Sequence, residues 1–358
     1  MGRVAPEIRF TRADDGVNLA YACSGHGPAL VRPPNWLTHI EHERTTPIWR
    51  PWIERLERHH TLYRYDSRGC GLSDHDAGEI TLERVVADLE AVVDAAGLAR
   101  FTLLGISLGG ATSIAYCAKH PERVDRLILC GAWARGTLRR SPTRAQSEAF
   151  MAMVKLIEVG WGERNSAFVQ MFTSQFFPEA TPEQAAAFNE MQRMAASPQR
   201  AAKLAKEFGE IDASACLGRI SCPALVLHCT GDARSPFEEG RYIAGGIPGA
   251  RFQPLESRNH VPLQGEPAFE QALAAIEAFV DAAAAHAFPA LTRRERTILE
   301  HLAQGLDNAQ IAARLELSEK TVRNNITQIF AKMEVENRPQ AIVRAREAGF
   351  GVRAAPRS

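Results

Sequence analysis

Short apolar runs alternate with helical patterns over the first 280 residues, and this alternation limits the possible folds more than any other feature of the chain. The apolar and β-branched runs occupy residues 8–11, 17–22, 29–32, 61–65, 101–106, 126–130, 224–229 and 250–254. Helical patterns at 82–96, 111–119 and 269–283 separate the later runs. Strands that alternate with helices predict an α/β fold, with a parallel sheet covered by helices on both faces. The opening runs are too close together for crossover helices, so we expect an antiparallel edge there.

A long helical region without a strand pattern lies between residues 130 and 224. It carries many large apolar side chains: Phe150, Met151, Met153, Trp161, Phe168, Met171, Phe172, Phe176 and Phe177. Such an insertion predicts a helical lid, at about 135–215, over the carboxyl ends of the strands. We expect some of these side chains to form the core of the lid and the others to face an apolar cavity.

The chain has 358 residues, more than the ~250 to 300 that one core usually serves, so we expect two domains. An Ala-rich stretch at 281–289 marks the boundary, which gives a domain over 1–282, a linker over 283–290 and a small domain over 291–358. The overall formal charge of +0 hides a difference between the two parts. Residues 291–358 hold twelve Lys and Arg against eight Asp and Glu, net +4, and the rest of the chain holds 30 against 34, net −4.

The seven cysteines form no C-x-x-C pair, and most lie in apolar runs, which is typical of buried thiols in a reducing compartment. No uncharged apolar run approaches the ~18 residues of a membrane span. We therefore expect a cytoplasmic protein without membrane contact.

The segment Gly105-Ile106-Ser107-Leu108-Gly109 follows one apolar run and precedes a helical pattern. A G-x-S-x-G sequence in this context predicts a nucleophile elbow, a tight turn that projects the serine hydroxyl above the sheet. Serine needs a histidine to take its proton, and that histidine needs an acid to orient it. Asp232 and His260 follow the last two predicted strands, so both lie at strand carboxyl ends, where open α/β sheets gather their sites.

Here the chain resembles the α/β-hydrolase family over about residues 7–282. The stretch Asp66-Ser67-Arg68-Gly69-Cys70-Gly71-Leu72-Ser73 is similar to that family's D-x-R-G-x-G-x-S motif, and residues 120–124 also match. The resemblance implies that Ser107 is the nucleophile, His260 the base and Asp232 the orienting acid. It also implies an oxyanion hole made by the backbone N–H groups of Leu108 and Trp36.

The loop before Trp36 departs from the family pattern, with Pro34-Asn35 in place of the common His-Gly pair. Two interpretations therefore stay open: a serine hydrolase of esters or lactones, and a pocket that binds such a compound with slow or no turnover. His39 and His42 lack a third metal ligand nearby, and no complete dinucleotide or phosphate-binding loop occurs. We expect neither a metal nor another cofactor.

After Pro289 the pattern changes to short helices with their own start signals. Residues 292–295 and 307–310 fit capping boxes, and Ser318 is placed to cap a third helix. Val322, Ile326, Ile329 and Met333 form one apolar stripe on that helix. Its opposite side carries polar side chains suited to hydrogen-bonding base edges.

Two helices joined by a short turn, the second polar on its outer face, indicate a helix-turn-helix. A helical oligomerisation module is the alternative. The sequence resembles the LuxR-type DNA-binding domain, on the following residues: Leu291, Thr292, Arg294, Glu295, Leu299, Ala303, Gly305, Asn308, Ile311, Ala312, Leu315, Ser318, Thr321, Val322, Arg323, Ile329, Lys332, Val335, Arg338 and Ala341. This resemblance implies that Arg323, Asn324 and Thr327 face the major groove, that Lys320, Thr321 and Lys332 lie on or near phosphates, and that the protein binds DNA as a homodimer.

The combined hypothesis is a transcription regulator that binds DNA and senses, and in the first interpretation also hydrolyses, a small ester, lactone or related carbonyl compound. The alternative is a serine hydrolase whose C-terminal module localises or oligomerises it.

Overall fold

The protein is described by a computed structural model that covers residues 7–161, 167–288, 290–347 and 350–351. The strands are β1 (Glu7–Arg12), β2 (Asn18–Gly25), β3 (Ala29–Arg32), β4 (Thr61–Tyr65), β5 (Phe101–Ile106), β6 (Val124–Cys130), β7 (Ala224–Cys229) and β8 (Arg251–Leu255). The helices of the sheet domain are α1 (Ile40–Glu43), α2 (Trp49–Glu57), α3 (Leu82–Ala95), α4 (Leu108–Lys119), α9 (Phe237–Gly246) and α10 (Pro267–Ala287). The inserted helices are η1 (Thr137–Arg139), α5 (Arg144–Gly160), α6 (Ala167–Phe176), α7 (Pro182–Ala195), α8 (Pro198–Glu210) and η2 (Ser214–Arg219). The C-terminal helices are α11 (Arg293–Ala303), α12 (Asn308–Leu315), α13 (Glu319–Met333) and α14 (Arg338–Glu347).

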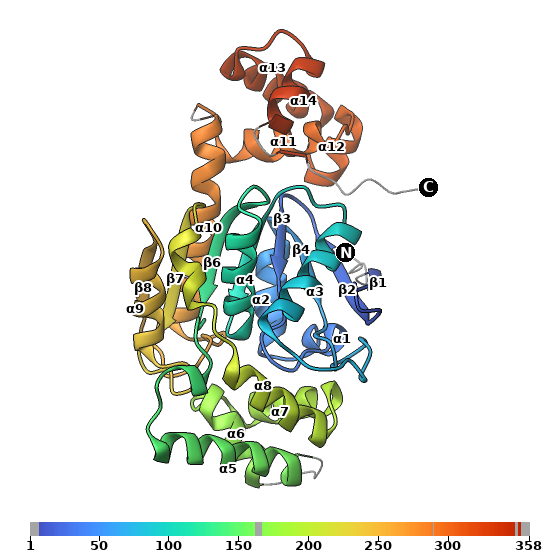
Figure 1. Ribbon diagram of the computed structural model, residues 1–358. Coiled ribbons are helices and arrows are strands. Elements are labelled where there is room, and N and C mark those ends of the chain that lie inside the picture. Colours follow the sequence, from blue (N-terminus) through green and yellow to red (C-terminus); the bar gives the residue numbers. More distant parts are fainter. Residues whose placement is uncertain (1–6, 162–166, 289, 348–349, 352–358) are drawn as a thin grey trace.

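One eight-stranded sheet in the order β1-β2-β4-β3-β5-β6-β7-β8 forms the centre of the large domain. β1 and β2 are antiparallel to each other, β2 is antiparallel to β4, and every other neighbouring pair is parallel. The expected α/β fold with an antiparallel edge is therefore confirmed. Since strands β3 to β7 are almost wholly buried, with helices on both sides of the sheet, their carboxyl ends form the edge where loops can gather a site (Figure 1).

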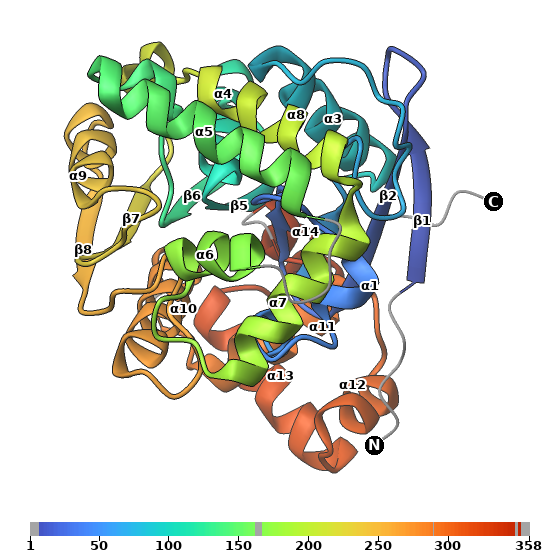
Figure 2. The same cartoon turned by 90° about the horizontal axis from the view of Figure 1, so that it is seen from below.

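The region expected as a lid contains helices α5 to α8, which lie together at one end of the sheet, as both views show (Figures 1 and 2). Their inward side chains join the main core: Trp161, Phe172, Phe176 and Phe177 are each at most 3% exposed. Met151, Phe168 and Met171, in contrast, are about 40% exposed, at 40%, 42% and 41%. The apolar residues of this region thus divide into a buried set and an outward-facing set.

A second hydrophobic core belongs to the C-terminal helices, which pack at the end of the sheet opposite the lid (Figure 1). Phe288 packs in this core against Phe350, with ring centroids 5.8 Å apart, although it was expected to belong to the linker. Helix α10 runs to Ala287, through most of the residues expected as a linker, so the two domains are joined by helix with little loop between them. Within the described ranges, no helix combines the length and the apolar character that crossing a membrane requires.

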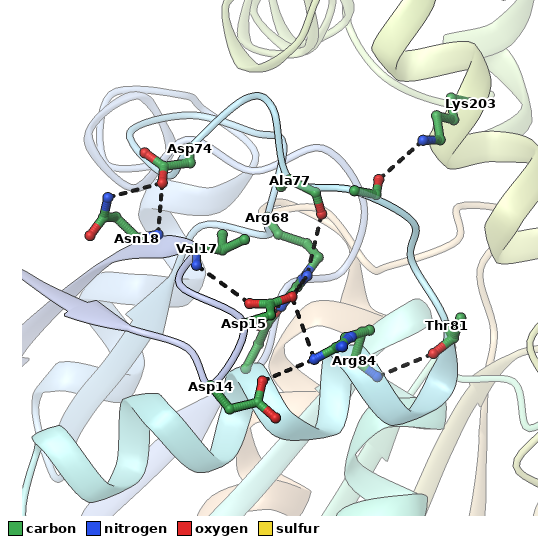
Figure 3. A network of polar contacts seen from close by, with 12 residues as sticks. Asp14, Asp15, Val17, Asn18, Arg68, Asp74, Ala77, Thr81, Arg84 and Lys203 are labelled. Atoms are coloured by element: carbon green, nitrogen blue, oxygen red, sulfur yellow. Dashed lines mark hydrogen bonds and ion pairs between the residues drawn. The ribbon is translucent and has the colours of Figure 1, made fainter.

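The segment Asp66–Ser73, which carried part of the family resemblance, forms the loop after β4 and is held by ion pairs and hydrogen bonds. Arg68 is buried, pairs with Asp88 at 2.5 Å and Asp15 at 2.8 Å, and donates to the carbonyl of Ala77 at 3.3 Å. Figure 3 shows Arg68 and Asp15 within a network of charges that links the first hairpin to α3. The Asp66 carboxylate accepts the backbone N–H groups of Ile40 and Leu72, both at 2.9 Å. The contacts of Arg68 and Asp66 indicate that this motif stabilises the fold of the loop.

Candidate functional site

Ser107 lies between β5 and α4 with φ 51° and ψ −120°, a backbone conformation that L residues rarely adopt. Such a turn is the strained elbow that raises a serine above the strand ends. Gly105 is required beneath it, because a Cβ there would lie 2.7 Å from the carbonyl oxygen of Gly109. The helix begins at Leu108, three residues before the expected start, directly after the serine. The sequence motif therefore has the local geometry that a nucleophile needs.

Asp232 and His260, the expected acid and base, contact each other. Asp232 follows β7, and its Oδ2 accepts the N–H of His260 Nδ1 at 2.7 Å, while both side chains are buried. The second carboxylate oxygen, Oδ1, accepts the backbone N–H groups of Arg234 at 2.8 Å and Ser235 at 2.9 Å. With both oxygens engaged, Asp232 holds the imidazole in the tautomer whose Nε2 is free to accept a proton.

His260 is fixed by two further contacts. Its backbone N–H donates to the carbonyl of Phe176 on α6 at 2.7 Å, and its ring meets the Phe176 ring edge-on, with centroids 5.6 Å apart. Gly131, with φ 56°, leaves room for the histidine, since a Cβ there would lie 2.6 Å from its carbonyl oxygen. Nε2 of His260 is buried and makes no hydrogen bond with any described residue, Ser107 included. Apo sites often show this loose serine–histidine geometry, which tightens when a ligand binds.

The expected oxyanion hole has one donor already engaged. The backbone N–H of Leu108 points to the carbonyl oxygen of Asn35, with an N to O distance of 3.4 Å. Asn35 is one of the two residues by which this loop departs from the family pattern, and its side chain is also buried. Until that carbonyl moves, the Leu108 N–H is shared between the loop and any developing oxyanion, which weakens the stabilisation such a donor gives. The sequence showed the departure at Asn35 but not the direction of its carbonyl.

Trp36 connects this loop to the lid. Its indole N–H donates to Oε1 of Gln192 on α7 at 3.0 Å, and Nε2 of Gln192 donates in turn to Thr173 on α6 at 3.3 Å. The indole also packs against Phe172 and Phe208, with centroids 5.7 and 5.5 Å away. Trp36 was expected to contribute only its backbone N–H. Its ring in fact joins the loop of Asn35 and Trp36, called the oxyanion loop below, to the three lid helices α6, α7 and α8. Gln192, fully buried on a polar helix, gave no signal in the sequence.

The C-terminal domain contains the predicted helix-turn-helix. Helices α12 and α13 are joined by Glu316 and Leu317, and Ser318 caps α13 by accepting the N–H of Thr321 at 3.1 Å. The expected capping boxes at Thr292 and Asp307 are both formed. The buried stripe on α13 is the predicted one, with Val322, Ile326, Ile329 and Met333 all in the small core.

The polar residues expected to meet DNA are on the opposite, exposed face of α13. Those exposed there are Lys320, Thr321, Arg323, Asn324 and Thr327. The Thr327 hydroxyl donates to the carbonyl of Arg323 at 3.1 Å. A helix with one side in the core and these side chains facing outward can enter a major groove and present donors and acceptors to base edges.

Lys332 differs from the other expected contacts. Its Nζ is bound by both oxygens of Glu295, at 2.7 and 2.6 Å, so the ammonium joins α13 to α11. Glu295 is buried and also accepts the backbone N–H of Thr292 in the capping box at 2.7 Å. Burial raises the pKa of Glu295, but the hydrogen bonds from Lys332 and Thr292 outweigh that effect and the pKa is lowered. Lys332 therefore has a structural partner within the domain, and its expected phosphate contact stays a prediction.

Other basic side chains of the small domain also serve its packing. Arg344 donates to the carbonyl of Met333, the last residue of α13, and Arg346 donates to that of Ala303, the last residue of α11, at 2.9 Å. Arginines at helix C-termini satisfy carbonyls that lack helical partners. The net charge of +4 therefore overstates the charge that is available to DNA.

A non-glycine residue in the left-handed region ends α12: Glu316 has φ 53° and ψ 46°. We expect Glu316→Gly to raise the free energy of unfolding of this domain by up to about 1 kcal/mol, because glycine adopts this conformation without the steric cost that a Cβ brings. Thermal melting followed by circular dichroism measures the effect. Glu319→Gly, in the first turn of α13, is the matched control and should lower stability. A lower melting temperature for Glu316→Gly would contradict the argument.

No group of three His, Cys, Asp or Glu side chains in the described residues is placed to hold a metal ion. His39 and His42, the pair considered in the sequence, lie against each other with ring centroids 4.5 Å apart.

Comparisons with known proteins agree with this geometry in both domains. Residues 289–345 match the luxR family of bacterial regulatory proteins. A putative carbamate hydrolase, RutD, from Azorhizobium caulinodans is 28% identical over 60% of this chain and 79% of its own length. Pyrrolizixenacetamide deacetylase from Xenorhabdus hominickii is 25% identical over 67% of this chain and 86% of its own.

Solved structures match the large domain in the same way. A hydrolase from Pseudomonas aeruginosa PA01 has a TM-score of 0.62 and 28% identity, and the match covers 76% of this chain and 99% of that one. Residues 42–265 match the α/β hydrolase fold family, which is more than half of the chain. The chain therefore belongs to the α/β hydrolase fold family and carries a C-terminal DNA-binding domain of the bacterial luxR type.

Proposed function

We propose that the protein is a transcription regulator that binds DNA through α13 and senses a small ester, lactone or related carbonyl compound through its hydrolase-fold domain. The observation that carries the DNA-binding part is the exposed polar face of α13, opposite a complete apolar stripe. In this proposal Arg323, Asn324 and Thr327 read bases, and Lys320 and Thr321 contact phosphates. We place the protein in the cytoplasm, where such a domain meets DNA.

The Asp232–His260 pair beside Ser107 supports recognition of a carbonyl compound. The names of the two curated relatives, a putative carbamate hydrolase and a deacetylase, both describe action on acyl or carbamoyl carbonyl groups. The engaged N–H of Leu108 favours sensing with slow turnover over rapid hydrolysis, since a fast esterase needs both oxyanion donors free. We propose that Ser107, His260 and Asp232 form a triad that turns over slowly while the ligand is held.

The two sites lie at opposite ends of the sheet, which limits how one can affect the other (Figure 1). The ring of His26, in the loop between β2 and β3, stacks on that of His301 in α11 with centroids 6.2 Å apart, and α10 joins the domains directly. A ligand changes DNA affinity only if it binds the DNA-competent and incompetent states unequally. We propose that lid closure alters the arrangement of two copies in a homodimer, which would bind two half-sites.

The alternative is a serine hydrolase whose small domain localises or oligomerises it. The observation that favours it is the buried Asp232–His260 hydrogen bond of 2.7 Å, which binding alone does not require. Specific DNA binding separates the two functions, because only the regulator needs it.

The test selects DNA from a random pool with the full-length protein and measures affinity by fluorescence anisotropy at a fixed salt concentration. We expect Arg323→Ala to reduce the preference for the selected sequence over random DNA by about 1 to 3 kcal/mol, since a base contact is lost. Arg144→Ala, which removes an exposed charge from the lid, is the control and should leave that preference unchanged. If the wild-type protein selects no sequence, the proposed role as a transcription regulator is wrong, and the serine hydrolase is the function that remains.

A further inference from the structure

Arg234 lies in the loop after β7, two residues beyond Asp232, where the lid meets the sheet. Its backbone N–H donates to Asp232, and its guanidinium stands over the ring of Phe176, 5.2 Å from the centroid. That same ring contacts the imidazole of His260. The guanidinium and the imidazole of His260 therefore contact the same aromatic ring.

The guanidinium of Arg234 makes neither a hydrogen bond nor an ion pair with any described residue, and the nearby carboxylates already have other partners. Asp232 uses both oxygens, as described above. Glu239 is paired with Arg135 at 2.5 Å and lies 4.0 Å from Nε of Arg140. Three arginines thus share this corner of the site with two carboxylates, one of which belongs to the triad.

Arg140 increases the excess of positive charge. It lies in the lid region between η1 and α5, its Nε donates to the carbonyl of Arg135 at 2.7 Å, and its side chain is 16% exposed. Burial and, to a smaller extent, the positive charge of Arg140 together lower the pKa of Arg234 to about 10, against the opposite effect of Asp232. Burial also lowers the pKa of Arg140. Both groups stay charged at neutral pH, so the pair places two positive charges in this corner of the large domain.

Arg234 is only partly exposed to water, and its stacking on Phe176 leaves the hydrogen-bond donors of the guanidinium unused among the described residues. Guanidinium groups match carboxylates in shape and bind them with two parallel hydrogen bonds. We propose that Arg234, with Arg140 beside it, binds a carboxylate on the ligand, so that the compound recognised near Ser107 is an anionic ester or lactone. This inference rests on the proposed recognition of a carbonyl compound, and it adds that this compound is negatively charged.

The test compares esters that differ in one charge. The anionic probes are the mono-4-nitrophenyl esters of succinate, glutarate and adipate, and the neutral probe is 4-nitrophenyl butyrate. For at least one chain length we expect Arg234→Gln to lower the ratio of anionic to neutral kcat/KM by about 10- to 100-fold, mainly through KM. Arg234→Lys should recover part of that ratio, which a role in packing on Phe176 would not predict. Arg241→Gln, on exposed α9, is the control and should leave all rates unchanged.

A binding measurement separates this proposal from turnover. Succinate, glutarate and adipate are added to full-length Ser107→Ala protein, and its melting temperature is measured. We expect at least one dicarboxylate to raise it, and Arg234→Gln to remove the increase. This result would support the anion site even if no ester is hydrolysed. If the neutral ester is turned over but no dicarboxylate stabilises the protein and no anionic ester is preferred, the anion site is wrong while the hydrolase function stands.

Discussion

Asp232→Asn is expected to lower kcat for a small ester by about 10⁴-fold. The amide oxygen can still accept the N–H groups of Arg234 and Ser235, so the loop after β7 keeps its shape. The amide nitrogen, however, donates a proton toward Nδ1 of His260, which places the ring proton on Nε2. A histidine in that tautomer cannot take the proton of Ser107, and the loss therefore appears in kcat.

Hydrolysis of 4-nitrophenyl acetate measures this effect, and a fluorescent fluorophosphonate reports the nucleophile directly. We expect the probe to label Ser107 in the wild type, more slowly in Asp232→Asn, and not at all in Ser107→Ala. Glu238→Gln, on the exposed side of α9, is the matched control and should behave as wild type. If Asp232→Asn hydrolysed the ester at the wild-type rate, Asp232 would not be the acid of the triad.

The oxyanion loop sets how fast even an intact triad can work. Because the Leu108 N–H already faces the Asn35 carbonyl, the transition state must compete for this donor or displace the carbonyl. The lid is connected to the loop through Trp36 and Gln192, so a ligand that moves the lid also moves the loop. Slow turnover and a ligand-sensitive lid are properties that suit a sensor, since a ligand that is destroyed quickly cannot hold a conformational state.

The strands could be predicted closely because burial on both faces leaves a continuous apolar run. β3, β4, β5 and β7 have the expected bounds. β6 begins two residues earlier than expected, at Val124, because the charged Asp125 separates Val124 from the expected run at 126–130. The linker expected at 283–290 is mostly part of α10, because its Ala-rich sequence has a high helix propensity. The change in composition at this point was wrongly interpreted as a linker.

The site residues that follow directly from the order of the strands and from their carboxyl ends could be predicted from the sequence. Features that depend on tertiary contacts could not. Ser107, Asp232 and His260 follow strands whose carboxyl ends share one edge. The direction of the Asn35 carbonyl depends on how α4 packs beneath its loop, and periodicity contains no information about it. The exposed polar face of α13 could be predicted from helical spacing. The ion pair of Lys332 could not, because its partner Glu295 is 37 residues away in sequence, on another helix.

The charge cluster beneath the oxyanion loop leads to the largest expected effect on stability. Glu43, at the end of α1, is buried with Arg32 and Arg64, and its Oε2 accepts from both, at 2.6 Å from Arg64. We expect Glu43→Gln to lower the free energy of unfolding by about 3 to 5 kcal/mol, because two buried guanidinium groups lose their only counter-charge among the described residues. Arg32 directly precedes the loop of Asn35 and Trp36, so the same change should loosen the oxyanion loop.

Urea unfolding followed by tryptophan fluorescence measures this effect, and all five tryptophans lie before residue 162, so the signal reports only the large domain. Glu41→Gln, an exposed neighbour on α1, should change stability by less than about 0.5 kcal/mol. Burial raises the pKa of Glu43, but Arg32 and Arg64 outweigh it and the pKa is lowered. The stabilisation is therefore present above the unfolded pKa of about 4.3 and is lost as the pH falls through the folded value. Wild type should lose stability more steeply than Glu43→Gln over that acid range, and equal slopes would mean that the carboxylate does not hold the two arginines.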